Sequence, residues 1–169
     1  MKVLGNAIAL SLASVPSAPP APPPPPVEAP PPPADKVELE AGSRVADATL
    51  AAAANFRPKK NQYYCYRYVK MGLRSALGVA LTGTHAYQAA AQLAKSPCFK
   101  ELGKPTRVLN PADLPRGAVV VWQPRPHHPS GHIFVSLGDG QEISDRIRIT
   151  NLSYGSTARI FIPSNDCLQ

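Results

Sequence analysis

Long hydrophobic runs are missing from this sequence of 169 residues, and so are numerous cysteines and a regular glycine repeat. No apolar run approaches the roughly 18–20 residues that a membrane-spanning helix requires, so we expect no transmembrane segment. The three cysteines are too few for a small scaffold held together by disulfides. The 21 prolines do not share a frame with glycine at every third position, which excludes a collagen triple helix.

Proline and charge are both distributed unevenly along the chain. Twelve prolines lie between Pro16 and Pro33, and this stretch can be neither helix nor central strand, because proline lacks the N–H and fixes φ. Residues 1–55 carry 3 basic and 5 acidic side chains, whereas residues 56–169 carry 15 basic and 6 acidic ones, a net charge of +9. The positive charge therefore belongs to the later part of the chain, which would be attracted to anionic polymers.

The first 18 residues have the layout of a secretory signal peptide. Lys2 supplies a positive charge, residues 3–15 are uncharged and mostly apolar, and the small residues Ser17 and Ala18 follow. The alternative is a weakly structured tail on a cytosolic protein. Residues 19–35 predict a polyproline II spacer, or alternatively a ligand for a proline-binding domain. We expect export, to the periplasm, the cell envelope or the medium.

Helical patterns come first and strand patterns follow, which predicts an α+β domain at residues 36–169. Apolar periodicity predicts helices over residues 36–55, 63–77 and 85–95. Short β-branched and apolar segments then predict strands, at residues 117–123, 132–137, 141–144, 146–152 and 158–162. The domain is expected to be helical to about residue 95 and β after it, with the helices packed on one face of a small antiparallel sheet.

Cys65 lies at the start of the second predicted helix. Unpaired backbone N–H groups and the helix dipole favour a negative charge at such a position by about 0.3–1 kcal/mol. The thiolate is the reactive form of cysteine, so this position suits a nucleophile. The alternative is a buried structural thiol, which is the commoner role of a lone cysteine.

His132 opens an apolar predicted strand directly after a proline-rich turn. A strand holds an imidazole in a fixed orientation, as a general base requires. A cysteine nucleophile needs such a base and a third polar group that orients it. Asp145 is our first choice for that group, because a carboxylate accepts the ring N–H and stabilises imidazolium. Ser144 and Glu142 are the alternatives, since a slip of one residue swaps strand faces.

Three segments, in this order and spacing, resemble the NlpC-type and CHAP-type cysteine peptidases and amidases, which are papain-like hydrolases of bacterial cell walls. The segments are Tyr64–Val69 (YCYRYV), Gly117–Trp122 (GAVVVW) and Gly131–Gly140 (GHIFVSLGDG), within residues 60–150. The resemblance implies a papain-like core in which Cys65 begins a helix as the nucleophile and His132 begins the second core strand as the base. The third catalytic position falls at Ser144 or Asp145.

The sequence departs from the family pattern at two places. Ala118 stands where relatives usually carry an acidic residue, which is mainly structural. Relatives of the NlpC type often have histidine at the third position, where this chain has Ser144 followed by Asp145. The second departure makes the CHAP-like relationship the more attractive of the two.

The resemblance implies an exported peptidoglycan hydrolase that cleaves an amide bond in wall peptides. Tyr64 offers a hydroxyl to the substrate or the oxyanion, or else packs on the core, and the backbone N–H of Cys65 is a natural oxyanion donor. The expected partners are peptidoglycan peptides and anionic wall polymers, the expected state is a monomer, and no cofactor is expected. The alternative is a non-catalytic wall-binding or adaptor module on the same fold, with Cys65 as a core residue.

Cys98 and Cys167 remain as a pair outside the predicted site. In an exported protein an even pair of cysteines suggests a disulfide, here between the helical half and the C-terminal tail. The alternative is two independent thiols. In both cases the catalytic cysteine would be the unpaired one.

Metal and nucleic-acid sites are not expected. His127, His128 and His132 lie within six residues, but no acidic residue stands at a recognised ligand spacing and the HExxH pattern is absent. Basic residues are dispersed, and residues 57–60 hold their one tight cluster. No helix-turn-helix, RRM or zinc-finger spacing accompanies them.

Overall fold

The computed structural model describes residues 39–57, 59, 63–103 and 110–168. The chain divides into two units, residues 1–34 and 35–169, and every described residue belongs to the second. The expected signal peptide and proline-rich linker lie outside the described residues. None of the described helices combines the length and the hydrophobicity that crossing a bilayer would need.

Among the described residues of the second unit, three α-helices form one layer, as the sequence predicts. α1 spans Glu40–Ala53, α2 spans Cys65–Leu77, and α3 spans Ala89–Leu93 after a 3-10 turn at Ala86–Gln88. α1 and α2 each bury one face of mainly small and aliphatic side chains. Gly78 ends α2 with φ +69°, the left-handed conformation that glycine adopts without a Cβ penalty.

Six antiparallel strands form the second layer in the part of the chain that the structure describes. The strands are β1 (Phe99–Leu102), β2 (Val119–Trp122), β3 (His132–Ser136), β4 (Gln141–Ile143), β5 (Ile147–Ile149) and β6 (Ala158–Pro163), and their order across the sheet is β1-β6-β2-β3-β4-β5. The sequence predicts five of them and misses β1. Only the first residue of β1 is buried, so this edge strand shows no alternation that a sequence pattern would reveal.

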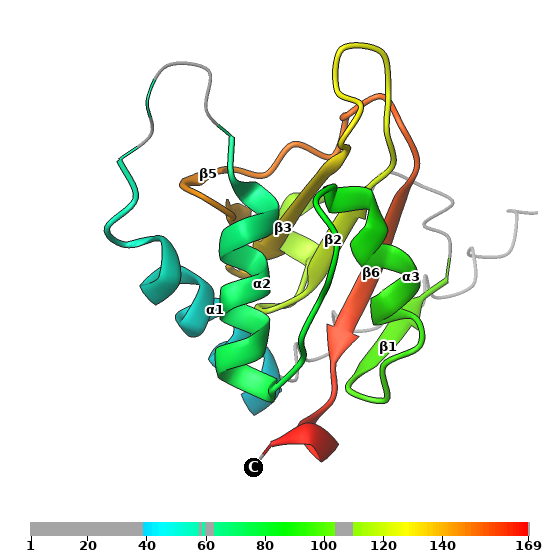
Figure 1. Ribbon diagram of the computed structural model, residues 1–169. Helices are drawn as coiled ribbons and strands as arrows, with labels where there is room; N and C mark the ends of the chain where they lie inside the picture. The colour runs from blue at the N-terminus through cyan, green and yellow to red at the C-terminus, as the bar shows by residue number, and fades with distance from the viewer. Residues whose placement is uncertain (1–38, 58, 60–62, 104–109, 169) are drawn as a thin grey trace, which may run out of the picture. The chain divides into compact units, whose positions relative to one another are not determined.

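Alternate residues of the central strands enter two separate apolar layers. Val121, Ile133 and Val135 belong to the cluster that contains the buried faces of the helices. Val120 and Phe134 point to the other side of the sheet and pack with loop residues. Figure 1 shows α1, α2 and α3 on the same side of the sheet. The observed architecture is therefore the expected one, with helices on one face of a small antiparallel sheet.

Two glycines let α1 lie directly on the chain that enters β2. A glycine inside a helix costs stability relative to alanine, but a Cβ on Gly42 would collide with the carbonyl oxygen of Arg116. Gly117, with φ +82°, approaches the backbone of Gly42 just as closely. The absence of both side chains therefore sets the distance between α1 and the sheet.

Cys98 and Cys167 form a disulfide, with their Cα atoms 5.4 Å apart. Cys98 precedes β1, and Cys167 ends the 3-10 turn Asn165–Cys167 that follows β6. The bond connects residues 69 positions apart and ties the last described turn to the β1 edge of the sheet. Cys65 is left as the free cysteine.

Removal of this disulfide should destabilise the folded domain. We expect the double variant Cys98→Ala/Cys167→Ala to lose about 2–4 kcal/mol of unfolding free energy, because the crosslink restricts the unfolded chain. Urea unfolding followed by tryptophan fluorescence measures the loss. Cys65→Ala, which removes an unbonded thiol, is the matched control and should change the midpoint far less. Equal midpoints for the double variant and the wild type would contradict this role.

Candidate active site

The thiol of Cys65 lies at the N-terminal end of α2. Cys65 is the first residue of the helix, and Tyr64 is its N-cap. The side chain is half-buried and takes no part in a disulfide, and it lines a groove of about 550 Å³. The backbone N–H groups at a helix start lack partners within the helix and favour a negative charge, so this position suits a thiolate.

His132 approaches the thiol from the sheet. It is the first residue of β3, it pairs with Trp122 of β2, and its side chain is 14% exposed. The ring of Tyr154 stacks on the imidazole with the ring centroids 5.7 Å apart. Gly131 has φ +65°, and a Cβ there would collide with the carbonyl oxygen of Trp122. The turn into β3 therefore requires glycine immediately before His132.

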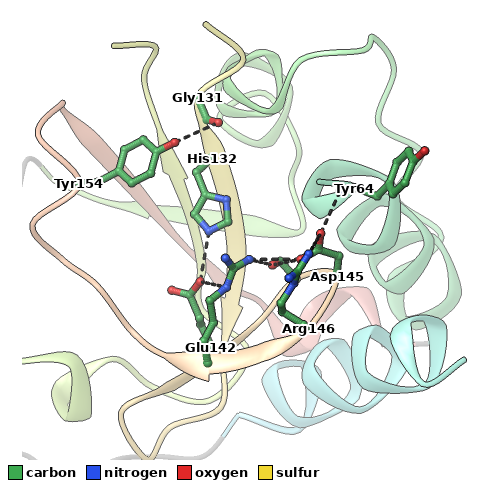
Figure 2. A network of polar contacts seen from close by, with 9 residues as sticks. Tyr64, Gly131, His132, Glu142, Asp145, Arg146 and Tyr154 are labelled. Atoms are coloured by element: carbon green, nitrogen blue, oxygen red, sulfur yellow. Dashed lines mark hydrogen bonds and ion pairs between the residues drawn. The ribbon is translucent and has the colours of Figure 1, made fainter. Parts of the chain in front are cut away.

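Glu142 of β4 contacts the imidazole of His132. The His132 Nε2 and Glu142 Oε1 atoms are 3.1 Å apart, and the Glu142 side chain is only 3% exposed; Figure 2 shows the contact. Glu142 lies opposite Ser136 of β3. Because alternate residues of a strand share a face, Glu142 and His132 project from the same side of the sheet.

Asp145, our first choice from the sequence for orienting His132, instead holds the start of α2. Its carboxylate is fully buried, and Oδ2 accepts the backbone N–H of Tyr64 at 2.9 Å (Figure 2). Burial alone would raise the pKa of Asp145, but the hydrogen bonds from Tyr64 and Arg146 lower it below its ordinary value. Ser144, the other alternative, accepts a hydrogen bond from Arg148 at 2.9 Å.

Arg148 of β5 bridges the two buried carboxylates. Its Nε lies 3.3 Å from Oε1 of Glu142, at ion-pair distance but without hydrogen-bond geometry. Its Nη2 donates to Oδ1 of Asp145 at 3.2 Å. The sequence analysis does not single out Arg148 or Tyr154. The sequence carries no signal for Arg148, because alternation in β5 predicts buried isoleucines, whereas Ile147 and Ile149 are exposed and flank a half-buried arginine.

Tyr64 lies in different surroundings from His127 and His128, which belong to the loop before β3. The ring of Tyr64 packs edge-on against Phe56 at 5.6 Å and points away from His132 in Figure 2, which fits the packed aromatic better than a hydroxyl aimed at substrate. His127 and His128 line the groove. Within the described part of the chain, no three histidine, cysteine or acidic side chains are grouped as metal ligands.

The surroundings of His132 raise its pKa from 6.5 to about 9. Burial alone would lower this pKa, since desolvation disfavours imidazolium. The neighbouring Cys65 and Glu142 side chains favour the charged form of the ring and outweigh burial. With its pKa raised to about 9, the imidazole carries a proton at neutral pH beside Cys65, which lines the same groove.

Comparison with known proteins finds a likeness in fold. No protein family and no curated protein matches the sequence. A chain of the type VI native effector–immunity complex Tae3–Tai3 from Ralstonia pickettii matches with a TM-score of 0.52 and 24% identity, over 73% of this chain and 98% of that one. A chain of the selenomethionine form of the complex gives a TM-score of 0.49 and 25% identity, over 69% and 98%. The first match shows that this arrangement of helices and sheet occurs in that complex.

The pKa of His132 can be measured directly. Histidine-selective NMR titration of the wild type should give a midpoint near 9 for His132. Cys65→Ala and Glu142→Gln should each lower it, because each removes a group that favours imidazolium while burial continues to oppose it. A wild-type midpoint near the ordinary value would contradict the described geometry.

Proposed function

We propose that this protein is an exported peptidoglycan hydrolase, a cysteine peptidase or amidase that cleaves an amide bond in cell-wall peptides. The observation that carries the proposal is that Cys65, at a helix start, and His132 line the same open groove, where Cys65 raises the pKa of His132. A thiol, an imidazole and an orienting carboxylate are the parts that such an enzyme needs. A helix-borne cysteine and a strand-borne histidine also fit the papain-like core that the sequence resemblance implies.

The proposed reaction begins with attack of the Cys65 thiolate on the carbonyl carbon of the amide. The C–N bond breaks as His132 gives its proton to the leaving amine, and a thioester remains. The backbone N–H of Cys65 is the proposed donor to the oxyanion. Water then attacks the thioester while neutral His132 accepts its proton, which releases the acid and restores thiolate and imidazolium.

Glu142 is the proposed third member of the site, in place of Asp145. It contacts Nε2 of His132 at 3.1 Å, so Nδ1 remains for the thiol. A carboxylate in this position holds the tautomer and orientation of the ring and stabilises its protonated form. Asp145 acts on the nucleophile instead, because its hydrogen bond to the backbone of Tyr64 fixes the residue that precedes Cys65.

The outer face of α2 supports an anionic wall polymer as the partner. α2 contains no acidic residue, and Arg67, Lys70 and Arg74 share one of its faces. Arg67 and Arg74 are exposed. A polymer held on this face would lie along the helix that carries the nucleophile at its N-terminal end. Long-range attraction of this kind raises the local concentration of a charged substrate.

The non-catalytic alternative requires a thiol sealed in the core. Cys65 is half-buried, and it lines the groove together with His132. An adaptor module would also have no need for an imidazole held in its protonated form beside that thiol. These observations favour the enzyme.

Digestion of purified peptidoglycan tests the proposed function. Mass spectrometry of the fragments should show new ends that identify the amide cleaved by the wild type. Cys65→Ala should reduce the rate by roughly 10³-fold or more, as for loss of a nucleophile in other hydrolases, and Cys65→Ser is the nearly isosteric control for packing. Identical fragment patterns for wild type and Cys65→Ala would sink the hydrolase proposal. Activity that survives Cys65→Ala but is lost on chelation would indicate a metal enzyme instead.

The similarity to a chain of an effector–immunity complex leads us to extend the proposal to toxicity toward bacteria. The full chain, directed to the periplasm of a Gram-negative host, should lyse the cells, because its substrate is exposed there. Falling optical density after induction measures this effect. The Cys65→Ala chain at equal expression is the control, and lysis by both chains would show that toxicity does not depend on the thiol.

A further inference from the structure

The mechanism above gives no role to Arg148, although this residue joins the two buried carboxylates of the site. We propose that Arg148 is a positioning residue, whose guanidinium fixes Glu142 against His132 and Asp145 against the start of α2. Through these two contacts it would keep the base and the nucleophile at a fixed distance from each other. The inference rests on the proposed function, but its main measurements do not require peptidoglycan.

The β4–β5 hairpin presents all three charged groups to one another. Glu142 of β4 and Arg148 of β5 lie directly opposite each other in the antiparallel ladder, so their side chains project from the same face. Asp145 lies in the turn between the two strands. The hairpin therefore places the arginine and both carboxylates next to one another.

Burial of the carboxylates strengthens the case for a shared counter-charge. The side chains of Glu142 and Asp145 are 3% and 0% exposed, whereas Arg148 is 37% exposed at the groove. A buried carboxylate without a partner is strongly unfavourable. Arg146 also contacts Asp145, but Arg148 is the described arginine that reaches both carboxylates.

The contacts of Arg148 complete a circuit through the site. From Tyr64 the path runs through Asp145, Arg148 and Glu142 to His132, which lines the same groove as Cys65, the neighbour of Tyr64. A planar guanidinium can address two carboxylates at a fixed angle, whereas a lysine ammonium is a single point charge on a flexible stem. Arg148 is therefore suited to set the spacing between the nucleophile and the base.

If Arg148 acted only through its positive charge, its loss would change the pKa of His132 in the direction opposite to that expected from loss of positioning. Loss of a positive charge near an imidazole favours its protonated form and would raise its pKa. Loss of positioning would let Glu142 leave Nε2, and the pKa would fall because burial then acts with less opposition. The sign of the change in Arg148→Gln therefore separates the two roles.

The experiment uses the full chain as wild type, Arg148→Gln, Arg148→Lys and Arg159→Gln. NMR titration gives the pKa of His132, iodoacetamide gives the alkylation rate of Cys65 at pH 7, and digestion of peptidoglycan gives kcat and KM. For Arg148→Gln we expect a lower His132 pKa, and an alkylation rate and a kcat that fall by roughly 10- to 100-fold with KM little changed. Arg148→Lys should change in the same direction and less, and it keeps the test valid if Arg148→Gln does not fold.

Arg159→Gln is the matched control, because it removes the same charge from a surface pair with Glu101 on β1 and should match the wild type in all readouts. A raised or unchanged His132 pKa in the Arg148 variants, with wild-type alkylation, would overturn the positioning role. If the wild type does not cut peptidoglycan but the His132 pKa and the alkylation rate still fall in the variants, the proposed function fails and the role of Arg148 stands.

Discussion

The hydrogen bond from the backbone N–H of Tyr64 to the carboxylate of Asp145, 2.9 Å long, joins the helical layer to the sheet at the site. The N-terminal N–H groups of a helix need partners from outside the helix, and here the partner comes from the turn after β4. Because Asp145 is fully buried, water does not readily replace it. The position of Cys65 relative to His132 therefore depends on where this turn lies.

Close backbone contacts at three glycines support the same arrangement of helices and sheet. Gly42 and Gly117 allow α1 to lie on the chain before β2, and Gly131 allows the chain to turn tightly into β3. A side chain at any of these positions would push the neighbouring helix or strand away. Close-packed interiors transmit such shifts. The position of the thiol relative to the imidazole is thus influenced by backbone packing at α1 as well as at Gly131 in the groove wall.

The sequence predicts the three helices, five of the strands and the pair of Cys65 and His132, because periodicity and position in a single element carry that information. The contact of Glu142, rather than Asp145, with His132 depends on the pairing of Ser136 with Glu142, which is a relation between two strands. Arg148 and Tyr154 belong to an edge strand and a loop without a motif. Their roles arise only once β4, β5 and the later loop are folded against β3.

The charges of the hairpin have a consequence for the proposed chemistry. Glu142 and Asp145 carry two negative charges, and Arg146 and Arg148 carry two positive ones, so the charges of the hairpin cancel. The pair of Cys65 and His132 is also neutral, both as thiol with imidazole and as thiolate with imidazolium. It remains neutral as thioester with imidazole, after the proton has left with the amine. The half-buried site would therefore pass through acylation without a change in its net charge, and no counterion would have to enter or leave.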